Sequence, residues 1–100
     1  MIVISGCMRI DVSKAYDFRK CVKQLVSETL KEPGCAKYCV SADLEEESIF
    51  HFFEEWNNKE ALDAHLLSPH MKEFQQKAGA ATQREGRKFR IYKVESAQAM

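Results

Sequence analysis

Three histidines are the side chains of this chain best suited to move a proton near neutral pH. An unperturbed imidazole titrates at about 6.5, so it can accept or donate a proton under physiological conditions. His65 stands three residues after Leu62 and one before Leu66, which places its ring on the inward face of a short helix. It is therefore either a general base in a ligand pocket or a core histidine bonded to a backbone carbonyl.

The other two histidines have different settings. His70 follows Ser68-Pro69 in the first turn of a second helix, where the helix dipole disfavours a positive imidazolium. A neutral ring there could act as a base, or it could make a structural contact to a free amide of its own turn. His51 alternates with Phe50 and Phe52, and we expect it on a sheet face turned to a partner, in a structural role.

One tryptophan and two acidic side chains fall in the same strand as His51. Trp56 is either a core anchor or a flat wall for an aromatic ligand, with an indole N–H that could orient a substrate oxygen. Glu54 and Glu55 lie in an otherwise apolar strand, so at least one should point inward. A buried carboxylate needs a partner, and we expect a structural ion pair, across the sheet or across a dimer, with a cation such as Arg9 or Arg90.

Periodicity and stop signals predict the elements that position these residues. Ser13 is the expected N-cap of the first helix, and Pro33-Gly34 should end it near Glu32. Asn57 and Glu60 suggest a capping box. The predicted strands are residues 1–11, 35–42, 49–56 and 88–94, and the predicted helices are residues 13–32, 59–67 and one opened by Ser68-Pro69 that carries Met71, Phe74, Ala78 and Ala81 on one stripe.

The order β-α-β-β-α-β predicts an α+β fold of the ferredoxin-like type, an antiparallel sheet with helices on one face, in a single domain over residues 1–100. The run Ile49 to Phe53 is apolar on both faces of its strand. Such a strand is expected to be covered on both sides, because soluble monomers rarely expose a large apolar patch. We therefore expect a homodimer.

Composition narrows the class of protein. With 45% apolar and 30% charged residues, a chain of 100 residues fits one soluble domain. Fifteen basic residues balance fifteen acidic ones with no basic stripe, which argues against nucleic acid as a partner. No apolar run is long enough for a membrane span and no signal peptide opens the chain, so we expect a cytoplasmic protein. Four cysteines have no zinc-binding spacing and are expected as reduced thiols: Cys7, Cys21, Cys35 and Cys39.

Two segments resemble a known family. Residues 53–72 contain E-x-W at a strand end and then A-H-L-x-x-P-H-M-K, and residues 32–38 read E-x-G-C-x-x-Y. The chain resembles the antibiotic biosynthesis monooxygenase family, most closely its bacterial quinol monooxygenase branch. The resemblance covers nearly the whole chain in order and spacing. It implies a homodimer of ferredoxin-like subunits packed sheet against sheet into a barrel-like core.

The resemblance also implies a cofactor-independent monooxygenase that acts on a hydroquinone or polyphenol. A deprotonated, electron-rich phenol can pass an electron to oxygen, so the protein needs a dry aromatic pocket, a base and a hydrogen-bond partner. His65 is the expected catalytic base, with His70 as the second catalytic candidate. The expected substrate pocket is formed by Trp56, Phe52, Tyr38 and Phe74.

No cofactor or metal is expected. There is no G-x-G-x-x-G or Walker loop for a nucleotide. The haem-degrading branch of the family uses an Asn, a Trp and a haem-ligating His. In register, His65 stands at the Trp position and Gln75 at the His position, which argues against haem.

Two other functions stay open. An isomerase or other proton-transfer enzyme on a small oxo compound would also use His65, and oxygen uptake would separate it from a monooxygenase. A non-catalytic, ligand-binding dimer is the third possibility, and it would tolerate replacement of His65.

Overall fold

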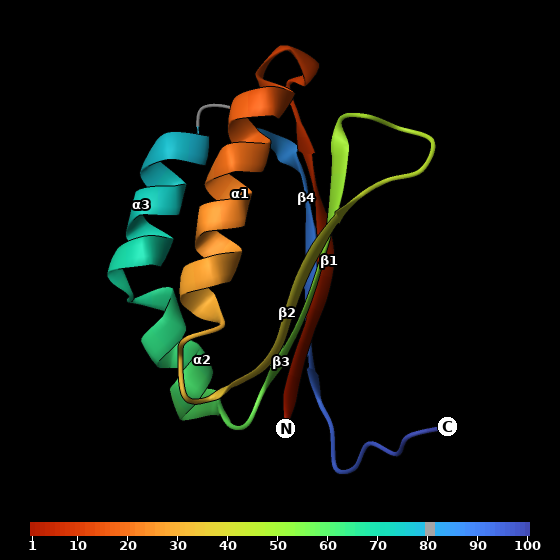
Figure 1. Ribbon diagram of the computed structural model, residues 1–100. Coiled ribbons are helices and arrows are strands. Elements are labelled where there is room, and N and C mark those ends of the chain that lie inside the picture. The colour runs from red at the N-terminus through yellow and green to blue at the C-terminus, as the bar shows by residue number, and fades with distance from the viewer. Residues whose placement is uncertain (80–81) are drawn as a thin grey trace.

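The structure, a computed structural model, describes residues 1–79 and 82–100 (Figure 1). For residues 82–85 it describes the backbone alone. Ala81, expected on the stripe of the last helix, lies outside the described residues. The elements in chain order are β1 (Ile2–Ile10), the 3-10 turn η1 (Val12–Lys14), α1 (Ala15–Thr29), β2 (Cys35–Ala42), β3 (Ile49–Trp56), α2 (Lys59–Leu66), α3 (Pro69–Ala78) and β4 (Thr82–Lys93).

The four strands form one antiparallel sheet in the order β2-β3-β1-β4. The helices cover one face of this sheet, and the other face is open in the single chain (Figure 1). The ferredoxin-like α+β prediction is confirmed.

The core lies between the sheet and the helices. Strands β1 and β3 bury alternate side chains on the helical side, as period-two alternation requires. Phe18 of α1 joins the layers, since its ring centroid is 4.9 Å from that of Phe50 on β3 and 5.9 Å from that of Phe74 on α3. Offset and edge-to-face aromatic contacts of this kind add to the free energy of apolar burial.

Helix boundaries differ in detail from the sequence prediction. The expected cap Ser13 is wrong, because Asp11 accepts from the Ser13 amide and a 3-10 turn precedes α1. The expected Asn57 cap is also wrong, since Asn58 accepts from the Ala61 amide at 2.8 Å. α1 ends at Thr29, so Glu32 stands in the turn beyond it. β4 begins at Thr82, six residues before the predicted Lys88.

Strand β3, which was expected to be apolar on both faces, directs alternate side chains to the two sides of the sheet. Phe50 and Phe52 are buried toward the helices, and His51 and Phe53 face the open side of the sheet, where Phe53 is 39% exposed. A dimer through this open side stays a prediction. The four cysteines are free thiols, as expected. Within the described residues, every helix is too short or too polar to cross a lipid bilayer.

Candidate active site

A cavity of about 420 Å³ lies between the helix-facing side of the sheet and helices α2 and α3. This volume falls in the range of about 300–1,000 Å³ typical of small-molecule sites. Its walls are mainly apolar, and Tyr38, Glu54, His65 and Arg87 supply the polar groups. The apolar lining residues are Ile4, Met8, Phe52, Leu62, Leu66, Met71, Phe74, Phe89 and Ile91.

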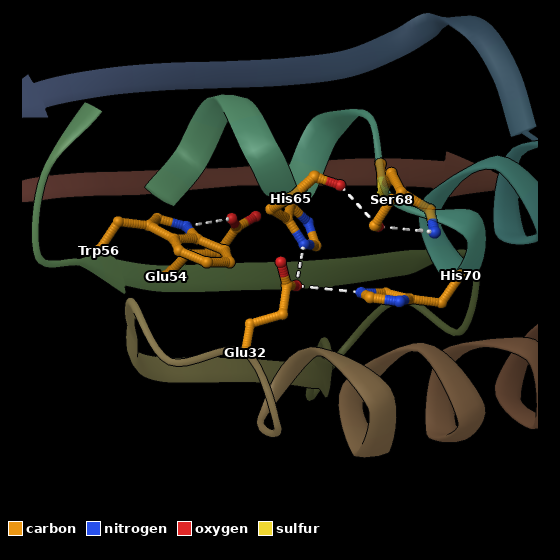
Figure 2. Close-up of polar contacts among 7 residues, drawn as sticks. Glu32, Glu54, Trp56, His65, Ser68 and His70 are labelled. Carbon is orange, nitrogen blue, oxygen red and sulfur yellow. Dashed lines mark hydrogen bonds and ion pairs between the residues drawn. The ribbon is translucent and has the colours of Figure 1, made fainter. Parts of the chain in front are cut away.

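His65 is held rigidly at the edge of this cavity. The residue is only 1% exposed, and its ring packs against the Trp56 indole, 4.6 Å between centroids, and the Tyr38 ring, at 5.5 Å. Its Nδ1 lies 2.7 Å from Oε2 of Glu32 (Figure 2). A carboxylate oxygen can only accept a hydrogen bond, so Nδ1 carries the hydrogen and Nε2 of the neutral ring is left with its lone pair.

The turn after α1 brings Glu32 to this position. Gly34 makes the approach possible, because a Cβ there would overlap Cβ of Ala61 on α2. The Gly34 carbonyl also accepts from the Asn57 amide at 2.9 Å, which ties the turn to the start of α2. The residue without a side chain thus lets the α1–β2 turn lie directly against the helix that carries His65.

His70 joins the same carboxylate from the opposite side. Its Nε2 lies 3.0 Å from Oε2 of Glu32, the oxygen that also faces His65 (Figure 2). Ser68 sets the spacing of the two histidines, since its hydroxyl donates to the His65 carbonyl at 2.6 Å and accepts from the Met71 amide at 3.2 Å. The expected cap Ser68 is therefore confirmed, and it fixes the junction of α2 and α3.

The electrostatics favour a neutral His65. Burial lowers the pKa of His65 most strongly, and the neighbouring His70 lowers it further. The hydrogen bond to Glu32 and the charge of Glu32 act in the opposite direction without reversing the shift. A neutral imidazole bonded through Nδ1 is the form that can accept a proton at Nε2.

A second carboxyl group lies in the cavity wall. Burial raises the pKa of Glu54, although the Trp56 indole N–H donates to its Oε1 at 2.9 Å and opposes the shift (Figure 2). Burial also raises the pKa of Tyr38, with a contribution from the negative charge of Glu54. Within the described residues of the single chain, the expected ion pair of this carboxylate is wrong: Arg9 donates to Ser48, and Arg90 stands opposite Ser5 in the register of β1 and β4, on the open side of the sheet. An ion pair across a dimer stays a prediction.

Of the six residues expected at the site, four line the cavity and two do not. Phe52, Tyr38, Phe74 and His65 line the cavity. Of the two possibilities for Trp56, the structure has the core anchor: the indole is fully buried behind His65 and does not belong to the cavity wall. His70 lies outside the cavity wall and contacts Glu32 instead.

Glu32 is a site residue that the sequence did not predict. Its side chain has no periodic context, because it stands in a turn between a helix and a strand. The available signal was its position two residues before Gly34 in the E-x-G-C-x-x-Y segment, since a glycine at a helix end often marks a close approach of two chain segments.

The family model of the antibiotic biosynthesis monooxygenases matches residues 1–77. The chain belongs to this family. A curated relative, an uncharacterized protein from Synechocystis sp., is 30% identical over 99 residues, which are 99% of this chain and 67% of the relative. Family membership supports a monooxygenase-like function in general terms, and none of these descriptions names a substrate.

Solved structures share the fold of this chain. A conserved protein from Methanosarcina mazei superposes with a TM-score of 0.86 at 32% identity, covering 94% of this chain and 92% of its own. A candidate antibiotic biosynthesis monooxygenase from Deinococcus radiodurans gives a TM-score of 0.89 at 24% identity, over 100% of this chain and 98% of its own. At 24% identity, the likeness to the Deinococcus radiodurans protein concerns the fold alone.

Proposed function

We propose that this protein is a cofactor-independent monooxygenase that oxidises a hydroquinone-type aromatic compound with molecular oxygen. The observation that carries the proposal is the buried His65, oriented by Glu32 and standing in the wall of an apolar cavity. The bacterial quinol monooxygenase branch of the family, which the sequence resembles, would use such a site.

In the proposed reaction, His65 is the general base. Glu32 accepts a hydrogen bond from Nδ1–H and so holds the ring in the tautomer with a free lone pair on Nε2. Nε2 then takes the proton of a phenolic hydroxyl bound in the cavity. Catalysis by a positioned base of this kind contributes about 10²- to 10⁴-fold to a rate.

The substrate supplies all the electrons that oxygen needs. The phenolate transfers one electron to O₂, and the resulting radical pair combines to form a carbon–oxygen bond and a peroxide. The O–O bond then breaks: one oxygen stays on the ring, and the other leaves as water with the proton held by His65 and one released by the ring carbon. A hydroquinone plus O₂ thus gives a hydroxyquinone plus water, with dioxygen reduced by four electrons.

The cavity wall suits such a substrate. Phe52, Phe74 and Phe89 offer aromatic surface, and Met71 can adapt to the shape of a flat ring. The Tyr38 hydroxyl offers a hydrogen-bond donor to the second oxygen of a hydroquinone, and the Glu54 carboxyl group lines the same cavity. Exclusion of water by the apolar lining would strengthen these contacts.

Oxygen consumption tests the proposal. Metal-stripped protein is mixed with hydroquinones, naphthalenediols and anthrones, and oxygen uptake is followed with an electrode while products are identified by mass spectrometry. We expect uptake of one O₂ per substrate and a product heavier by one oxygen and lighter by two hydrogens. His51→Gln is the matched control, because His51 is an exposed histidine paired with Asp43 on the other side of the sheet. Absence of uptake with every compound would refute the proposal.

A second candidate function is proton transfer on a small oxo compound. It is favoured by one observation: a carboxyl with raised pKa, Glu54, lines the same cavity as the neutral imidazole of His65. Two such groups could remove a proton at one atom and return it at another. Substrate turnover without oxygen uptake would identify this reaction.

A further inference from the structure

The side chains of Glu32, His65 and His70 come from three segments of the chain and meet at one carboxylate oxygen. Nδ1 of His65 and Nε2 of His70 lie 2.7 Å and 3.0 Å from the same atom, Oε2 of Glu32 (Figure 2). One nitrogen or oxygen atom from each residue lies within 4.8 Å of the other two. Two imidazoles and a carboxylate form a donor set that divalent transition-metal ions bind in proteins, with other coordination positions left to water.

We propose that Glu32, His65 and His70 bind one divalent transition-metal ion, represented by Zn²⁺, and that this ion inhibits the enzyme. The inhibition rests on the proposed function, whereas the metal binding does not. The ion is a regulator in this proposal, so it is compatible with a reaction that needs no cofactor.

The geometry of the cluster is close to that of a metal site. Zinc–nitrogen distances are about 2.0–2.1 Å and zinc–oxygen distances about 2.0–2.2 Å, which puts tetrahedral donors about 3.3 Å apart. The N···O distances of 2.7 Å and 3.0 Å are shorter because a proton lies between each pair of atoms. They must open by a few tenths of an ångström, and the two histidine nitrogens, which lie within 4.8 Å of each other, must approach to about 3.3 Å. Glu32, in a turn, and His70, which is only partly buried, can supply this movement.

The position of the ion explains why it would inhibit. Glu32 and His70 are not in the cavity wall, so the ion would sit behind the imidazole of His65, on the side away from the substrate. It would occupy the lone pair of Nδ1, and a neutral imidazole then keeps its proton on Nε2. Nε2–H can donate a hydrogen bond but cannot accept a proton. The ion would therefore convert His65 from the Nδ1–H tautomer to the Nε2–H tautomer, and Nε2 could no longer act as the general base.

The donor set also predicts which ions bind. Imidazole nitrogens suit Zn²⁺ and its neighbours in the first transition row, whereas Mg²⁺ and Ca²⁺ prefer sets made of oxygen alone. On binding, the ion takes the place of the hydrogen on Nδ1 of His65, and this hydrogen moves to Nε2 of the same ring, so the neutral imidazole releases no proton. Mg²⁺ thus serves as a negative control at equal charge.

The test is a calorimetric titration of the metal-stripped protein with ZnCl₂ and with MgCl₂. Wild type is compared with His70→Gln and Glu32→Gln, and His51→Gln is the control because it removes a histidine that pairs with a different carboxylate, Asp43, at 2.7 Å. Circular dichroism shows that each variant is folded. We expect one Zn²⁺ per chain. Changes outside the ligand shell already cost about 10- to 100-fold in metal affinity, so loss of a ligand should weaken binding at least as much.

Several results would overturn the metal site. Unchanged Zn²⁺ affinity in both His70→Gln and Glu32→Gln would do so, as would an equal loss in His51→Gln. Burial raises the pKa of the Cys35 thiol, and the charge of the nearby Glu32 carboxylate raises it further, so Cys35→Ser is titrated as well. A loss of affinity in Cys35→Ser, or a thiolate-to-metal charge-transfer band with Co²⁺, would contradict the assignment to two nitrogens and one oxygen.

Inhibition is measured separately, with any substrate found in the oxygen-uptake screen. We expect stoichiometric Zn²⁺ to abolish turnover and a chelator to restore it, while Mg²⁺ has no effect. Zn²⁺ binding to the cluster without loss of turnover would overturn the tautomer exchange. If no substrate is oxidised, the proposed function fails, and the calorimetric titration still decides whether the cluster binds the ion.

Discussion

Glu32 accepts a hydrogen bond from Nδ1 of His65 at 2.7 Å, although the two residues are 33 positions apart in the chain. Neither belongs to a local motif that requires the other. The contact exists because the turn after α1 lies against α2, and it determines which nitrogen of His65 is free. The proposed reaction and the proposed metal site both depend on this pair.

Replacement of His65 by glutamine should remove the base while keeping a polar side chain of similar volume. We expect the rate constant of the folded fraction to fall by about 10²- to 10⁴-fold. Oxygen uptake and thermal melts are measured on the same preparations, so that loss of activity is separated from loss of fold. If the variant loses about 1 to 3 kcal/mol of stability and its folded fraction turns over normally, His65 is a structural histidine.

Gly34→Ala should displace the turn that holds Glu32. The added methyl group would overlap Cβ of Ala61, and overpacking of this kind costs about 1–3 kcal/mol. We expect a lower melting temperature and weaker turnover. Gly79→Ala is the control, because a Cβ at Gly79 meets no atom within 4 Å. The double variant Gly34→Ala with Ala61→Gly should recover part of both losses, and the absence of any recovery would contradict this explanation.

Strands and helices could be predicted because each has its own local pattern. Alternation in β1 and β3, the Pro33-Gly34 stop and the Ser68 cap are all signals within a few residues. The caps found at Asp11 and Asn58 were predicted one or two residues away, at Ser13 and Asn57, because all four side chains can accept a hydrogen bond from a free helix amide. The partner of His65 could not be predicted, because a contact between a turn and a distant helix leaves no periodic trace.

The buried carboxyl group of Glu54 makes a prediction about pH. Burial raises its pKa above the ordinary value of 4.5, so the folded state holds this proton more tightly than the unfolded state does. Stability is therefore lost as pH rises from the ordinary pKa to the raised one. Glu54→Gln, which still accepts from the Trp56 indole, should melt higher than wild type at about pH 8 and show a smaller difference at about pH 4. Glu55→Gln on the open face is the control; equal shifts in both variants would contradict the prediction.

The open face of the sheet predicts a homodimer. Phe53 is 39% exposed there, and Ile49 and Val3 are partly buried on the same side. Light scattering should give about twice the chain mass of 11.5 kDa. Phe53→Lys should shift the protein toward the monomer, whereas Tyr16→Lys, at a 71% exposed position on α1, should not. A monomeric wild type at micromolar concentration would end the sheet-to-sheet model.

The exposed apolar rim of the cavity has a consequence for which compounds reach it. Leu66, Phe89 and Ile91 all line the cavity, and Ile91 remains 64% exposed to water. A compound that enters past them moves from water into mainly apolar surroundings. Each additional buried CH₂ on a substrate should gain about 0.8 kcal/mol, or roughly fourfold in affinity. Among related hydroquinones, the protein would then bind the more hydrophobic ones more tightly, and alkylated hydroquinones would saturate the site at the lowest concentrations.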